Sequence, residues 1–394
     1  MSAAAARRRK QLLLKKQQAA AESESSDPVN ARLYSLLSDS EESAESVAYE
    51  ALQLAQSQIR RHVKADQPQD AVKLAFDVSM ILLEKKKRMV SVASQLLGSL
   101  AEVVTETKVE CTDDLVDKFA KVDAAYGKAL AEGYDLNVEK DKEEVERLQR
   151  LHMSFLKKVT KWSADYGSIL HGHFILQELV GEQCWVVGQH AQDGNQEAKD
   201  ASIERRSEAI THLTLAEKPQ RIIELLKTMP APTKDEEKMG RNGGTAAERD
   251  CLLTRSILIF IALENLRDAN ALLISFTKDI SHKRDIDTLA KSYMDKTDGF
   301  APSHAMFCNM LLQTCEKERA GPLFQWLLRS FASDLNSMKP DVKAYTTKIG
   351  RVYFGIQPPP SMLNMMENMM AMMGGAGGMG GMPMGAMGGM GRGM

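Results

Sequence analysis

Two histidines and two cysteines are the side chains whose spacing first suggests chemistry. His171 and His173 stand two residues apart; on a helix they would point to different faces, and no Cys, Asp or Glu follows at i+4 to complete a zinc site. Cys308 and Cys315 share a helical face at i, i+7, but a buried free cysteine usually acts as a small apolar residue. We expect capping or core histidines, inert thiols and no bound metal.

The glycine-rich segments do not have the pattern of a phosphate-binding loop. MGRNGGT at 239–245 lacks the order GxxxxGK[ST], and no strand precedes it. No Ser/His/Asp or Cys/His pair stands in a recognisable catalytic context. An enzyme with an unseen site is therefore the least favoured alternative, and we expect no cofactor.

Charge and cysteine content favour a cytosolic protein. Lys and Arg number 51 and Asp and Glu 53, a net charge of −2 that offers no overall attraction to nucleic acid or to an anionic membrane. Five cysteines without a CxxC pair suit a reducing compartment. The apolar run at 256–263 is too short to cross a bilayer, which takes about 20 residues. We expect no secretory signal and no stable membrane insertion; RRRK at 7–10 is either a nuclear address or a solvated tail.

Apolar side chains recur at helical spacing through the middle of the chain. The clearest stripes are Ala71, Leu74, Ala75, Val78 and Leu82; Ala93, Leu96, Leu97, Leu100 and Val104; Leu115, Phe119, Val122 and Tyr126; and Leu148, Leu151, Phe155, Val159 and Trp162. Further helices are predicted near 170–187, 219–228, 247–277, 302–315, 321–333 and 341–354. Helices with one apolar stripe need neighbours to cover it, which predicts an all-α solenoid of stacked antiparallel pairs, degenerate and tetratricopeptide-like; a compact bundle is the alternative.

Composition sets the expected boundaries. Residues 1–45 are too polar to bury and are predicted to form a disordered arm, followed by the solenoid at 46–357, a Met-rich helix at 358–373 and a disordered Gly/Met tail at 374–394. Polar segments near 190–205 and 230–246 are predicted to be surface loops, the first in part continuing as helix.

Two surface features are candidates for binding. IRRHVK at 59–64 and EKKKR at 84–88 are either solvated turns or docking sites for an acidic partner. A methionine stripe at helical spacing either contacts a client or partner, docks on the solenoid's own end, or stays disordered. The stripe comprises Met362, Met365, Met366, Met369, Met370 and Met373.

YTTKIGRVYFGIQPPPSMLNMMENMM at 345–370 resembles the C-terminal signature of the Golgi to ER traffic protein 4 family, and residues 49–75 are similar in spacing to that family's first helical hairpin. The resemblance implies a non-enzymatic α-solenoid scaffold in the targeting of tail-anchored membrane proteins to the endoplasmic reticulum. Its N-terminal half would bind a targeting ATPase and its C-terminal half a ubiquitin-like adaptor, with a co-chaperone carrying tail-anchored clients as a further partner.

The same resemblance implies where the partners bind. It makes Arg60, Arg61 and Lys64 candidates for the ATPase contact. Candidates for the adaptor contact are Leu311, Leu312, Phe324, Trp326 and Leu327. The loops near 190–205 and 230–246 and the Gly/Met tail depart from the family pattern. The alternative function is a Met-rich co-chaperone that itself shields transmembrane segments.

Overall fold

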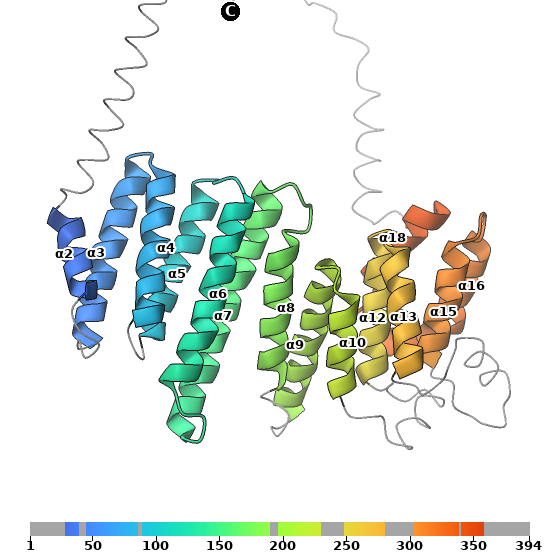
Figure 1. Ribbon diagram of the computed structural model, residues 1–394. Coiled ribbons are helices and arrows are strands. Elements are labelled where there is room, and N and C mark those ends of the chain that lie inside the picture. The colour runs from blue at the N-terminus through green and yellow to red at the C-terminus, as the bar shows by residue number, and fades with distance from the viewer. Residues whose placement is uncertain are drawn as a thin grey trace, which may run out of the picture.

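A computed structural model shows an array of helices (Figure 1). The structure describes residues 28–38, 45–85, 89–189, 196–229, 248–279, 303–338 and 340–357. The regular elements of these residues are all α-helices: α2 (Pro28–Ser38), α3 (Glu45–Lys64), α4 (Pro68–Lys85), α5 (Val90–Glu106), α6 (Asp113–Gly133), α7 (Glu139–Tyr166), α8 (Phe174–Gln189), α9 (Gln196–Leu215), α10 (Pro219–Thr228), α12 (Glu248–Ala262), α13 (Leu266–Asp279), α15 (Ser303–Cys315), α16 (Gly321–Ser330), α17 (Ala332–Ser337) and α18 (Lys343–Phe354).

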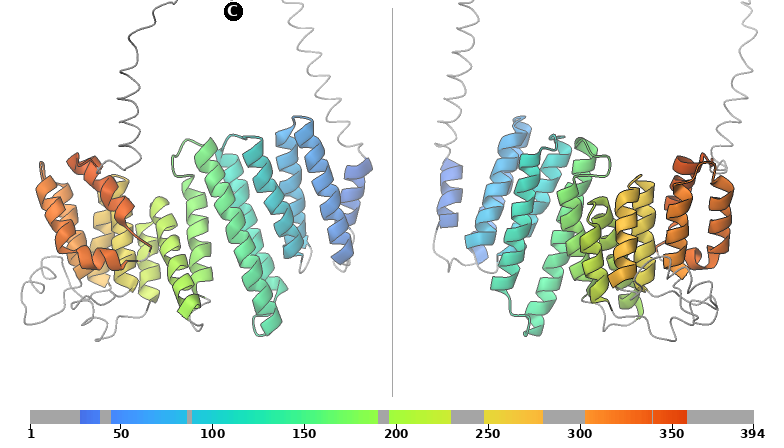
Figure 2. Two further views of the ribbon diagram at one scale, coloured as in Figure 1. Left: turned by 180° about the vertical axis from the view of Figure 1, so that it is seen from behind. Right: turned by 45° about the vertical axis from the view of Figure 1, so that its right-hand side comes forward.

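Successive helices run antiparallel and stack side by side, so that α3 and α16 stand at opposite ends of the array (Figures 1 and 2). Many helices pack on their neighbours in the chain, as α3 does on α4, α4 on α5 and α8 on α9. Others pack on the next helix but one, as α5 does on α7 and α6 on α4 and α8. At the C-terminal end α12 also contacts α15 and α18. The arrangement confirms the predicted all-α solenoid.

One continuous hydrophobic core runs through the array because each helix turns its apolar stripe inward. The predicted stripes of α4, α5 and α6 are buried throughout. On α7 the stripe is buried except at Leu151, which is 40% exposed. The indole of Trp162 does more than fill space: its Nε1–H donates to the carbonyl of Val109 at 2.8 Å, and so ties α7 to the turn between α5 and α6.

Four turns repeat one backbone geometry although none contains glycine. Asp66, Lys108, Glu217 and Glu264 have φ of 57°, 52°, 56° and 64° in the left-handed region. After each, the next amide donates to the carbonyl five residues back, at 2.9, 3.1, 3.1 and 2.9 Å respectively, which is the Schellman arrangement for ending a helix. These turns lie along one edge of the array (Figure 1). The array therefore repeats the backbone geometry of its turns although the sequence of the turns does not repeat.

Three sequence-based expectations need correction. Residues 28–38 belong to helix α2, not to a disordered arm, because Leu33 is fully buried and the helix packs on α3. Residues 196–215 form the full helix α9 where a loop was expected for the most part. The single helix expected at 247–277 is two helices, α12 and α13, separated by the left-handed turn at Glu264.

Replacing Glu264 by glycine should raise the free energy of unfolding by about 0.5–1 kcal/mol, because glycine removes the Cβ strain of the left-handed conformation. Urea denaturation at constant pH measures it. The matched control is Gln53→Gly in the exposed middle of α3, which should lower stability by about 1 kcal/mol. A loss of stability with Glu264→Gly would show that the turn carries no such strain.

Candidate functional site

The C-terminal turn of α3 presents a group of exposed cations, here called the basic end. Arg60, Arg61 and Lys64 are all exposed. Their backbone is fixed, because Ile59 is buried in the core and the Schellman turn at Asp66 closes the helix. Cations at a helix C-terminus also interact favourably with the helix dipole, so stabilising α3 is the alternative role of these residues.

The second basic segment lies at the other end of the α3–α4 hairpin. α4 contains 18 residues and ends at Lys85, so at 1.5 Å per residue about 27 Å of helix separates the two ends. Residues 86–88 lie outside the described residues. The antiparallel pairing therefore puts the described part of the second segment, Glu84 and Lys85, at the opposite end of the hairpin from the basic end.

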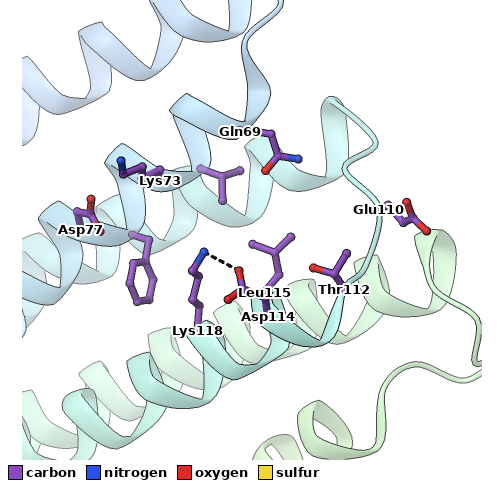
Figure 3. A pocket seen from close by; sticks show the side chains of 10 residues that line it. Gln69, Lys73, Asp77, Glu110, Thr112, Asp114, Leu115 and Lys118 are labelled. Atoms are coloured by element: carbon purple, nitrogen blue, oxygen red, sulfur yellow. Dashed lines mark hydrogen bonds and ion pairs between the residues drawn. The ribbon is translucent and has the colours of Figure 1, made fainter. Parts of the chain in front are cut away.

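A groove of about 350 Å³ lies between α4 and the start of α6 (Figure 3). Val72, Phe76 and Leu115 supply its apolar lining, and the ion pair of Lys118 with Asp114, 2.7 Å long, lies beside it. The remaining lining residues are Gln69, Lys73, Asp77, Glu110 and Thr112. An apolar floor with charges of both signs suits one anchoring side chain of a partner protein, and it has no arrangement of general acid and base.

The five residues proposed for adaptor contact divide into two classes. Leu311, Leu312, Phe324 and Leu327 are at most 2% exposed and belong to the core. Trp326 alone of the five reaches the surface, with 51% of its area exposed. The four buried residues thus act by positioning α15 and α16, and a direct contact can come only from Trp326.

Sequence reasoning missed one neighbour of Trp326. Leu323 lies three residues earlier on α16 and is 40% exposed, so the two side chains share one face of the helix. We call Leu323 and Trp326 the α16 face. The i, i+3 spacing was readable in the sequence, but only burial shows which of two apolar stripes on α16 faces water.

The quoted C-terminal signature has a packing explanation. A Cβ placed on Gly350 would lie 3.2 Å from Cε1 of Phe324, so glycine lets α18 approach α16 closely. Phe354 stacks on Phe324 with ring centroids 4.7 Å apart. Gly355 then ends α18 with φ of 63°, a conformation that glycine adopts without strain. The signature therefore fixes α16, and with it the α16 face.

A polar junction at α7, α8 and α9 joins the two halves of the array. Lys157 pairs with Glu208 at 2.6 Å, linking α7 to α9. Gln177 on α8 contacts His212 on α9 through Oε1 and Nδ1, 2.5 Å apart. Burial lowers the pKa of His212 from its usual 6.5 to about 4, although Glu208 nearby opposes the shift. The junction therefore holds His212 neutral at physiological pH.

A second ion pair continues this junction toward the C-terminus. Arg206 on α9 makes a bidentate contact with Glu248 on α12, through Nε at 2.6 Å and Nη2 at 2.9 Å. The same guanidinium donates to the carbonyl of Gly188 at 2.8 Å. A nearly buried arginine with bonds to both α8 and α12 fixes the relative placement of α8, α9 and α12.

The histidine pair that suggested a metal site is used in the turn before α8. His173 accepts the amide of Ile175 through Nδ1 at 3.3 Å, and its own amide donates to Ser163 Oγ at 3.0 Å. His171 packs edge-on against Phe174. Across the described ranges, no group of three or more His, Cys, Asp or Glu side chains is placed to hold a metal ion.

Of the two thiols that suggested redox chemistry, Cys308 is the more deeply buried. Cys308 is fully buried on α15, and burial raises the pKa of its thiol to about 12. Burial raises the pKa of Cys315 to about 12 as well. A thiol with so high a pKa is not a nucleophile at neutral pH. The Sγ of Cys308 lies 3.5 Å from Thr254 Oγ1, a contact between α15 and α12. Cys308 is therefore a packing residue.

Two further predictions concern membranes and the methionine stripe. In the part of the chain that the structure describes, each helix is too short or too polar to cross a bilayer. The stripe from Met362 to Met373 lies outside the described residues, as does the Gly/Met tail.

A family model, a curated protein and a solved structure each match most of the chain. Residues 65–373 match the family model described as Golgi to ER traffic protein 4. Protein GET4 of Arabidopsis thaliana is 23% identical over 320 residues, which cover 78% of this chain and 86% of that protein. A crystal structure of C. therm. Get4 aligns with 92% of this chain and 99% of its own, at 19% identity and a TM-score of 0.47.

Acid should destabilise the junction through His212. Because its folded-state pKa is lowered, stability is full above the unfolded pKa of 6.5 and is lost as pH falls toward about 4. A shift of this size corresponds to about 3 kcal/mol. Urea denaturation of the native chain and His212→Gln between pH 7 and pH 4 should show a smaller loss in the variant. Equal losses in both proteins would contradict this assignment.

Proposed function

Because the chain belongs to the Golgi to ER traffic protein 4 family, we propose that it is a non-enzymatic cytosolic scaffold for targeting tail-anchored membrane proteins. Its N-terminal helices, α3 to α6, hold a targeting ATPase, and its C-terminal helices, α12 to α18, hold a ubiquitin-like adaptor. Family membership places the chain in Golgi-to-ER traffic, and the bridging role is what we add. The solenoid at 46–357 is thus divided into two binding halves.

The placement of the two candidate surfaces carries the proposal. The basic end lies on α3 and the α16 face on α16, at opposite ends of the array (Figure 1). A continuous core and the polar junction connect them. Two proteins can therefore occupy the scaffold together without touching the same helix.

The chemistry of each surface indicates the kind of partner. Exposed cations such as Arg60 and Arg61 attract an acidic surface, speed association and lose strength as salt rises. An exposed tryptophan beside a leucine is typical of the anchor of a protein interface. The basic end thus supports the ATPase contact, and the α16 face supports the adaptor contact.

Reversing the charge of the basic end should release the ATPase alone. In a pull-down from cytosolic extract followed by mass spectrometry, Arg60→Glu, Arg61→Glu and Lys64→Glu together should reduce ATPase recovery by about tenfold or more, since each reversal turns an attraction into a repulsion. Recovery of the ubiquitin-like adaptor should stay unchanged.

The matched control reverses three exposed lysines on α7, outside the helices assigned to the ATPase, with Lys140→Glu, Lys142→Glu and Lys161→Glu. It changes net charge equally and should keep the ATPase. If both triple variants lose the ATPase, the effect is one of net charge. If neither native chain nor variant recovers either partner, and membrane-protein precursors appear instead, the co-chaperone alternative replaces the scaffold.

Truncating Trp326 tests the other half. Trp326→Ala should weaken adaptor binding by about 10- to 100-fold, the range for an interface anchor, and should leave ATPase binding unchanged. Titration with purified adaptor measures it, with Val186→Ala on α8, an exposed apolar residue elsewhere, as the control. An unaltered adaptor affinity would remove the α16 face from the interface.

A further inference from the structure

The α16 face is exposed although the rest of its helix is well packed. Phe324 and Leu327 anchor one side of α16 in the core, while Leu323 and Trp326 point away from it. Trp326 keeps 51% of its area exposed, and Leu323 keeps 40%. A leucine and a tryptophan side by side on the helix at the end of the array form an apolar surface that water solvates poorly.

The described chain ends next to this helix. Gly321 opens α16, and a Cβ built on it would lie 3.7 Å from Cβ of Phe354 and 4.0 Å from Cδ1 of Ile356. Gln357 is the last described residue of the chain. Whatever follows position 357 therefore starts at the N-terminal end of α16.

The sequence that follows has the right length and chemistry to cover α16. Pro-Pro-Pro-Ser at 358–361 spans about 12 Å in the extended conformation that proline favours, close to the width of one helix. The twelve residues from Met362 to Met373 would make a helix about 18 Å long, against about 15 Å for the ten residues of α16. Glu367 is the one charged residue in 361–373.

We propose that the methionine stripe docks on the α16 face of its own chain. Thioether groups pack favourably against aromatic rings, and the flexible methionine side chain adapts to an irregular surface such as that around Trp326. The tether supplies an effective concentration on the order of millimolar, so an intrinsic dissociation constant of about 0.1 mM already gives about 90% occupancy. The segment is a built-in cover of the α16 face, and a partner that binds Trp326 must displace it.

Iodide quenching of tryptophan fluorescence tests the cover directly in the full-length chain. Of the three tryptophans, Trp162 and Trp185 are buried, so a change in iodide quenching reports on Trp326. Replacing Met365, Met366, Met369 and Met370 by glutamine keeps helix propensity and removes the four central methionines of the six in the stripe. The glutamine variant should show an iodide quenching constant about twofold or more above that of the native chain, because the cover is lost.

The matched control places four glutamines in the tail, at Met379, Met382, Met384 and Met387, and should quench like the native chain. The variant Trp326→Phe measures the fluorescence and quenching that come from the two buried tryptophans alone. Equal quenching of the native chain and the stripe variant would overturn the proposal. If Trp326 is protected from iodide only at high protein concentration, the proposal is also overturned, because a second copy of the chain would then cover the α16 face. The test uses no partner protein, so its outcome is separate from that of the scaffold proposal.

Discussion

Each helix of the array buries one apolar stripe against its neighbours, and no pair could do so alone. The core that results is continuous from Leu33 on α2 to Ile349 on α18, so every helix is placed by the ones beside it. This linear dependence is what separates the basic end from the α16 face and holds them apart. It also explains why apolar residues near a candidate surface, such as Leu311 and Leu312, act by packing and not by contact.

Polar groups complete the array where the apolar stripes are weakest. The amphipathic pattern of α9 is poor. Besides the burial of Ala209, Ile210 and Leu213, this helix is held by the guanidinium of Arg206 and by the ion pair of Glu208 with Lys157. Such bonds are directional, so they fix the angle at which α8, α9 and α12 meet. The middle of the scaffold thereby gains a defined geometry that apolar packing alone would leave looser.

Much of the fold was readable from the sequence, and the exceptions have physical causes. Helices α4 to α7 were found because their stripes follow a helical period. α9 was predicted only in part because its buried residues include Ser202 and Arg206, which carry no apolar signal. The break between α12 and α13 was missed because Glu264 makes the left-handed turn without glycine or proline.

The candidate surfaces were harder to predict. The sequence identified the cations of α3, and the structure finds them exposed. The sequence could not show that Trp326 is exposed while Phe324 and Leu327 are buried, because all three are apolar residues of one short helix. Only the packing of α18 on α16, which Gly350 permits, decides which of them reaches water.

The central claim is that two partners bind at the same time to distant ends of one chain. Sedimentation velocity of the chain mixed with purified ATPase and purified ubiquitin-like adaptor tests it most directly. Simultaneous occupancy predicts a complex containing all three proteins, heavier than either binary complex. A mixture of the two binary complexes with no heavier species would mean that the partners exclude one another, and would contradict the scaffold.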